Sequence, residues 1–166
     1  MLSTAGIEHN LDEIQRLYDA TSNPLEAQFY AKLATLELCG WIETAVDDLV
    51  LGTGRRLIIE PADYAEFEQQ VVARTYGFHY GQHIRPILVS LVGLTGVERL
   101  EAQVNPARFH PMCAELGTLK SVRDSHAHSF TNGATTNLDA PSAIRGRYTR
   151  VRNGLADLET VLTGLK

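Results

Sequence analysis

Arginine and histidine are the residues of this chain whose types and spacing are best suited to chemistry. The segment LKSVRDSHAHSF at 119–130 places Arg123 five residues before His128, with Asp124 directly after the arginine. A guanidinium is always charged and can bind two phosphate oxygens at once, whereas an imidazole titrates near neutral pH. The pair therefore suits metal-independent cleavage of RNA by transesterification, with the imidazole carrying a proton and the arginine stabilising the charged phosphorane.

Asp124 lies four residues before His128, the spacing at which two side chains meet on one helix face. Its carboxylate can accept a hydrogen bond from one imidazole nitrogen, which fixes the tautomer and raises the basicity of the ring. Arg123 and His128 lie about 140° apart around a regular helix, so we expect the helix to fray at 126–129 and let the histidine turn toward the arginine. His126 competes with His128 for the same role.

A second group of histidines occurs in FHYGQH, where His79 and His83 are four residues apart. Two histidines on one helix face can bind zinc, but neither a third ligand nor an HExxH glutamate is supplied locally. We therefore interpret them as polar residues at a helix boundary. The arginine–histidine spacing also occurs at Arg74 and His79, but Gly77 and the aromatic residues make that segment a poor helix end, so we favour the Arg123 copy.

The RxxxxH spacing with a polar residue after the arginine resembles the hallmark of the HEPN superfamily, all-helical domains that include many ribonuclease toxins and defence effectors. In that family the motif lies near the loop after a late helix, and a final helix follows, an order that this sequence shares. The LELCGWIETAVDDL stretch at 36–49 is similar to the branch named RiboL-PSP-HEPN. The resemblance implies Arg123, His128 and Asp124 as catalytic residues, no cofactor or metal, and a homodimer whose two motifs face each other across a composite cleft.

One position departs from the family pattern, and one alternative stays open. HEPN toxins controlled by a nucleotidyltransferase antitoxin often carry a tyrosine two positions after the motif histidine, but this chain has Phe130, so an antitoxin partner of that type is in doubt. Arg123, Asp124 and His128 also fit an ordinary helix C-terminus, where basic side chains complement the helix dipole. The second hypothesis is a non-catalytic HEPN-like module that binds RNA or a protein partner.

The elements that must position these residues are all helical. Apolar residues recur at helical spacing, and no run of alternating β-branched residues is present. We predict an all-α bundle of five to seven helices, HEPN-like and a single domain over 1–166. Residues 52–54, Gly-Thr-Gly, are expected to end the second helix, which should be the central and most buried one. The expected helices are about 6–20, 25–51, from Pro61, 83–94, 97–104, 112–128 and a C-terminal helix after a polar loop.

The C-terminal helix has the most regular pattern, with apolar residues that alternate in steps of four and three. This seam indicates packing within a bundle against the second helix or, with less weight, contact with a second copy. Four arginines of the same helix are ordinary solvated side chains or could hold backbone phosphates. Glu37 and Glu43 of the second helix are weaker candidates as partners of Arg123, because most helix glutamates are exposed. The seam residues are Ile144, Tyr148, Val151, Leu155, Leu158, Leu162 and Leu165, and the arginines are Arg145, Arg147, Arg150 and Arg152.

Composition limits the classes of function. The 166 residues are 44% apolar with a net charge of −5, which fits one globular domain and argues against non-specific coating of nucleic acid, although 104–166 carry more basic than acidic side chains. No GxxxxGK[ST], GxGxxG or GxSxG motif is present, which excludes nucleotide hydrolases, dinucleotide enzymes and serine hydrolases of the common folds. The N-terminus is acidic and no apolar stretch is long enough for a bilayer, so we expect a cytoplasmic protein. Cys39 and Cys113 are expected to be reduced thiols.

Overall fold

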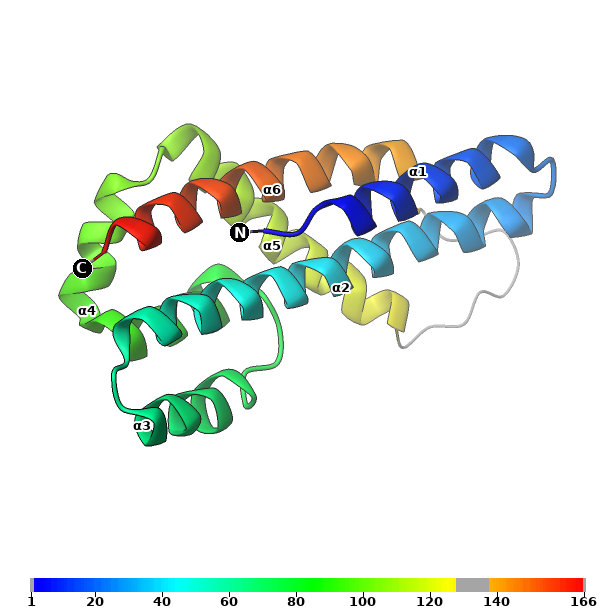
Figure 1. Ribbon diagram of the computed structural model, residues 1–166. Helices are drawn as coiled ribbons and strands as arrows, with labels where there is room; N and C mark the ends of the chain where they lie inside the picture. The colour runs from blue at the N-terminus through cyan, green and yellow to red at the C-terminus, as the bar shows by residue number, and fades with distance from the viewer. Residues whose placement is uncertain (1, 128–137, 166) are drawn as a thin grey trace.

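The computed structural model describes residues 2–127 and 138–165, and these form a helical bundle with a smaller lobe at one side (Figure 1). The described ranges contain six α-helices and no strand, which confirms the predicted all-α bundle of five to seven helices. Within these ranges no helix combines the length and the apolar character needed to cross a membrane. The long helices are α1 (Ala5–Ala20), α2 (Pro24–Leu57), α4 (Arg85–Gln103), α5 (Pro106–Ala127) and α6 (Pro141–Gly164).

Helix α2 is the central helix of the bundle, as predicted, and contacts α1, α5 and α6. The side chain of Asn23 caps its start by accepting a hydrogen bond from the amide of Leu25 at 3.0 Å, and Pro24 occupies the first turn. Buried side chains follow one another along the helix from Ala31 onward. Its first two turns differ, because Leu25 and Phe29 are 41% and 48% exposed.

The prediction that residues 52–54 end this helix was wrong, because α2 continues to Leu57. A Cβ placed on Gly54 would lie 3.0 Å from a ring carbon of Phe67. The missing side chain at Gly54 therefore allows a close approach between α2 and the lobe rather than a helix stop.

Helix α6 packs along α5 and α2, which confirms that its apolar seam serves the bundle. Helices α5 and α6 approach each other closely at Gly154, where a Cβ would lie only 2.4 Å from the Cβ of Met112. Arg56 of α2 donates hydrogen bonds to the carbonyls of Leu162 and Thr163 at 2.9 and 3.1 Å, and so satisfies the last turn of α6. The buried seam residues are Ile144, Tyr148, Val151, Leu155, Leu158 and Leu162.

The break expected between the helices at 83–94 and 97–104 is present as a kink at Gly93 inside α4, where φ is 71° and the backbone is not helical. Another predicted boundary was wrong. Helix α5 begins at Pro106 rather than near Met112, and Pro111 lies inside it. Asn105 supports this earlier start, because its side chain accepts a hydrogen bond from the amide of Ala107 at 3.0 Å.

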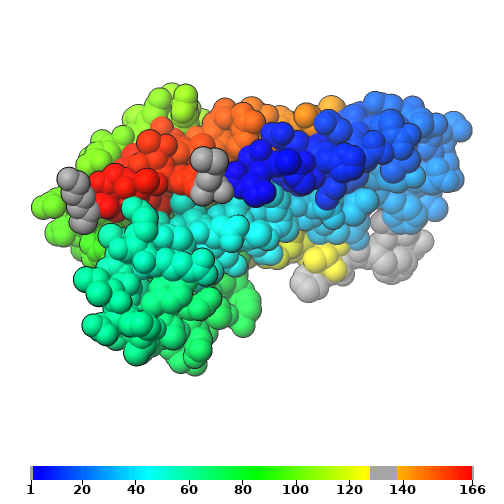
Figure 2. Space-filling model, in the orientation of Figure 1, coloured from blue at the N-terminus to red at the C-terminus, as the bar shows by residue number. Residues whose placement is uncertain are grey.

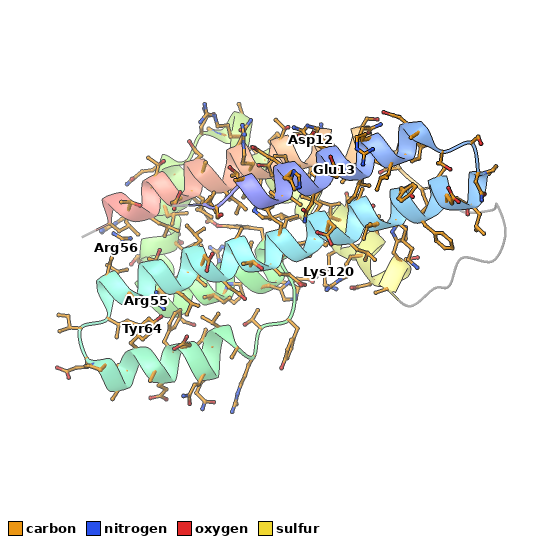
Figure 3. The ribbon with its side chains drawn as sticks, turned by 45° about the vertical axis from the view of Figure 1, so that its right-hand side comes forward. Asp12, Glu13, Arg55, Arg56, Tyr64 and Lys120 are labelled. Atoms are coloured by element: carbon orange, nitrogen blue, oxygen red, sulfur yellow. The ribbon has the colours of Figure 1, made fainter. Side chains whose placement is uncertain are left out.

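The lobe contains α3 (Pro61–Glu66) and the π-helical turn η1 (Phe67–Val72), and a second π-helical turn, η2 (Tyr80–Ile84), leads into α4. Figure 2 shows the lobe projecting from the side of the bundle. Helix α3 buries none of its side chains, and Arg55 of α2 lies over the ring of Tyr64 at 5.7 Å (Figure 3). Residues 75–79 are not helical, in agreement with the break predicted in this region.

Candidate functional site

Arg123, the predicted phosphate-binding residue, lies near the C-terminal end of α5 and is anchored toward α2 and the lobe. Its Nη1 donates a hydrogen bond to Oε1 of Glu43 at 2.8 Å. The guanidinium carbon lies 5.7 Å from the ring centroid of Phe78. Its buried Nε lies 2.8 Å from Oδ1 of Asp124, an ion pair that lacks the alignment of a hydrogen bond. With a side chain only 26% exposed, Arg123 is a fixed group rather than a solvated one.

Asp124 is held between two cations. Its Oδ2 accepts a hydrogen bond from Nζ of Lys120 at 2.8 Å, and Figure 3 shows Lys120 on α5. This hydrogen bond and the positive charges of Arg123 and Lys120 lower the pKa of Asp124 below its usual range. His128 lies outside the described residues, so the predicted bond between Asp124 and His128 stays a prediction. Both carboxylate oxygens of Asp124 are already close to a cation.

A pocket of about 310 Å³ opens beside Arg123. Its walls are Glu43 and Asp47 from α2, Arg123 from α5, and the residues of 72–77 other than Arg74. Gly77 adopts a φ of 122°, a conformation that side chains with a Cβ rarely take. Two carboxylates, a guanidinium and a backbone segment thus surround one polar space.

The rings of His79 and His83 support the pocket wall. The amide of His79 donates to Nδ1 of His83 at 3.1 Å, and the amide of Gln82 donates to Nδ1 of His79 at 3.3 Å. Since Nδ1 accepts in both rings, we place the proton of each neutral ring on Nε2. A Cβ added to Gly77 would lie 3.1 Å from Cε1 of His83, so this ring packs directly against the pocket segment.

The two histidines are not arranged as a metal site. With Nδ1 used and Nε2 protonated, neither ring offers a free lone pair to a metal ion. The described ranges hold no cluster of three or more histidine, cysteine, aspartate or glutamate side chains placed to bind a metal. Burial, followed by the positive charges of Lys120 and Arg123, lowers the pKa of His83, which favours the neutral ring. His79 caps η2, in agreement with the interpretation of both residues as part of a helix boundary.

His126 is half-buried on the last described turn of α5. Its Nδ1 is buried and has no hydrogen-bond partner among the described residues. Burial and the positive charge of Lys32 lower its pKa, whereas Asp139 acts in the opposite direction. A neutral imidazole with an unused nitrogen is chemically suited to carry a proton, so the choice between His126 and His128 remains a matter for experiment.

The arginines of α6 are engaged within the fold. All four form ion pairs with carboxylates of α1, of α5 or of the residues preceding α6, and Figure 3 shows one of these partners, Asp12, on α1. A phosphate would have to compete with these carboxylates, so the arginines tie helices together in the absence of a ligand. The pairs are Arg145–Asp12, Arg147–Glu115, Arg147–Asp139, Arg150–Glu115 and Arg152–Glu8.

Sequence reasoning undervalued one carboxylate of α2 and missed a second. Glu43 ranked low as a partner of Arg123 yet binds it directly, whereas Glu37 accepts a hydrogen bond from Asn10 of α1 at 2.9 Å. Asp47 was not considered. The available signal was the four-residue spacing of Glu43 and Asp47, each directly after a buried apolar residue, which places both carboxylates beside the buried face of α2.

Comparison with protein-family models, with curated protein sequences and with solved structures finds no match for this chain. Any functional conclusion therefore rests on the geometry and chemistry of its own residues.

Proposed function

We propose that this chain is a metal-independent endoribonuclease of the HEPN type that cleaves RNA by transesterification, as a cytoplasmic toxin or defence effector. The observation that supports the proposal is Arg123, a half-buried arginine of the RxxxxH motif on the wall of a pocket. Helix α5 carries Arg123 and Asp124 of the motif near its end, and α6 follows as the final described helix, which is the order expected for HEPN domains. His128 would carry a proton, and Asp124 would help to position the motif.

In the proposed reaction a phosphodiester replaces Glu43 as the partner of Arg123. The guanidinium then neutralises the charge that develops on the non-bridging oxygens as the ribose 2′-oxygen attacks phosphorus. The bond from phosphorus to the 5′-oxygen breaks, which leaves a cyclic phosphate on one product and a 5′-hydroxyl on the other. Because the guanidinium stays charged at all relevant pH values, this role needs no metal ion.

The proposal includes a homodimer with a composite cleft. The α6 seam is used inside the chain, so a dimer must form through another face that brings the two copies of Arg123 together. Light scattering after size-exclusion chromatography tests this part directly. We expect twice the mass of one chain, and a monomer at the concentration where cleavage occurs would contradict the composite cleft.

The cleavage reaction is tested with a mixed-sequence RNA in the presence of EDTA, with the ends of the products identified. We expect wild type to leave cyclic phosphate ends, and Arg123→Ala and His128→Ala to lose this activity while keeping their helical circular dichroism. Arg74→Ala is the matched control, because Arg74 belongs to the other RxxxxH copy and is exposed outside the pocket lining. Activity lost in Arg74→Ala and retained in Arg123→Ala would assign the site to the wrong arginine.

A second candidate function is a non-catalytic HEPN-like module that binds RNA or a protein partner, antitoxin included. The observation that favours it is the pairing of Arg123 with two carboxylates, Glu43 and Asp124, which leaves the guanidinium less available to a phosphate. In that case a folded dimer would cleave no RNA and Arg123→Ala would alter only binding. Electrophoretic mobility shift with the same RNA separates this function from the enzyme.

A further inference from the structure

The proposed reaction needs a group that removes the proton of the ribose 2′-hydroxyl, and the pocket beside Arg123 contains one that has no other role. Asp47 lies one helical turn after Glu43, and both side chains line the pocket. Glu43 accepts a hydrogen bond from Arg123. Asp47, in contrast, takes part in no hydrogen bond or ion pair within the described ranges and stands at the exposed rim.

The surroundings of Asp47 favour its protonated form more than those of an ordinary aspartate. Partial desolvation of its carboxyl comes first, followed by the negative charges of Glu43 and Asp48 on the same helix, and together they raise the pKa of Asp47. The other ionisable groups that line the pocket are Arg123 from α5 and the phenol of Tyr76 from the lobe.

The carboxylates on the two sides of Arg123 therefore differ in character. Lys120 lowers the pKa of Asp124, which stays ionised and paired, whereas the pKa of Asp47 is raised and its oxygens are unoccupied. Opposed shifts within one site are typical of groups that divide structural and acid–base roles. A carboxylate with a raised pKa is a better general base than a paired one, because its conjugate acid is weaker.

We propose that Asp47 is the proton acceptor of the Arg123 pocket, taking the proton of the ribose 2′-hydroxyl while Arg123 binds the neighbouring phosphate. This inference rests on the proposed ribonuclease function. The 2′-hydroxyl proton moves to an Asp47 oxygen, the 2′-oxygen bonds to phosphorus, and the bond to the 5′-oxygen breaks. The departing 5′-oxygen takes a proton from His128, the proton carrier of the proposed function. Asp47 then releases its proton to solvent and His128 regains one, so both groups are restored.

The test is the pH dependence of RNA cleavage by wild type, Asp47→Asn and Asp48→Asn, with EDTA present. We expect Asp47→Asn to lower kcat by about 10²-fold or more with little change in KM, and to lose the acidic limb of the wild-type profile. Asp48→Asn is the matched control, since it removes the same charge from the adjacent residue and lies outside this pocket. It should keep the activity and move the acidic limb to lower pH, because the Asp48 charge contributes to the raised pKa of Asp47.

The outcomes separate this inference from the proposal on which it rests. If Arg123→Ala abolishes cleavage but Asp47→Asn matches wild type in kcat and pH profile, the role of Asp47 is wrong and the ribonuclease function stands. If wild type does not cleave RNA as a folded dimer, both are overturned. Asp47 is exposed, so its variant should fold, and circular dichroism with thermal unfolding checks this.

Discussion

Arg123 on α5 donates a hydrogen bond to Glu43 on α2 at 2.8 Å, and 80 positions of the chain separate the two residues. The ion pair connects two helices at the edge of the pocket. Glu43 also neutralises the positive charge of Arg123 that would otherwise attract a phosphate. An anionic ligand that binds Nη1 of Arg123 must therefore exchange with a carboxylate of the protein itself. The effect of this exchange on affinity can be measured.

Replacing Glu43 should strengthen the binding of RNA. In Glu43→Gln the competing charge is lost while a neutral acceptor of the same size remains, and we expect affinity for a non-cleavable 2′-deoxy oligonucleotide to rise about tenfold. Fluorescence anisotropy at low salt measures the change. Glu37→Gln is the control, because it removes the same charge from α2 at a position bonded to Asn10. Equal or weaker binding by Glu43→Gln would show that the ion pair does not compete with the ligand.

The identity of the catalytic imidazole can be decided by comparing His126→Ala with His128→Ala. The five-residue motif spacing predicts that only His128→Ala abolishes cleavage, with a loss of about 10²-fold or more. His126→Ala should retain activity and remove a buried nitrogen that lacks a partner in the described ranges, so its stability should not fall. The reverse result, with activity lost in His126→Ala alone, would assign the proton-carrying role to His126.

Gly154→Ala should destabilise the bundle. The added Cβ would lie 2.4 Å from the Cβ of Met112, which belongs to a helix and cannot move away freely. We expect a loss of about 1–3 kcal/mol in the free energy of unfolding, measured in urea. Gly40→Ala is the matched control, because nothing lies within 4 Å of its Cβ position on α2 and alanine favours the helix. An unchanged midpoint for Gly154→Ala would mean that α5 and α6 can separate without cost.

Stability should decrease in alkaline solution. Burial raises the pKa of Cys39 to about 12, of Cys113 to about 11 and of Tyr148 to about 12, so the folded state favours the protonated form of each. Their contribution is complete below the ordinary values near 9 and 10 and is lost as the pH rises toward the folded-state values.

Urea unfolding at about pH 8 and about pH 10.5 should therefore show a lower midpoint at the higher pH. Cys39→Ala should reduce the difference between the two midpoints. An equal midpoint for wild type at both values would contradict the burial of these groups.

Sequence periodicity predicted the helices well and their ends less well. The seam from Ile144 to Leu162 predicted α6 and its packing, because apolar residues at helical spacing indicate a helix with one buried face. The helix boundaries predicted at Gly54 and next to Pro111 were wrong. Glycine can end a helix or allow a close contact between helices, and proline can begin a helix or be accommodated within one. Only the packing partner, such as Phe67 for Gly54, distinguishes these uses.

The candidate site was predictable in its motif and not in its partners. Arg123 and Asp124 are named by local spacing, whereas Glu43 and Asp47 reach the site through the packing of α2 against α5 and the lobe. Local spacing in a single sequence does not indicate which of many exposed carboxylates will lie next to an arginine distant in the chain. The segment 75–79 contributes a pocket wall through its backbone, for which side-chain types give little signal.

The lobe has a consequence for local unfolding. Helix α3 buries no side chain, and contacts such as Gly54–Phe67 and Arg55–Tyr64 connect the lobe to α2. Segments with few buried apolar groups open at a lower free energy than the core, so amide hydrogens of 61–77 should exchange with solvent faster than those of α2 and α6. One wall of the pocket thus belongs to a part of the fold that we expect to open more readily than α2 and α6, and a ligand that fills the pocket would slow exchange along this segment.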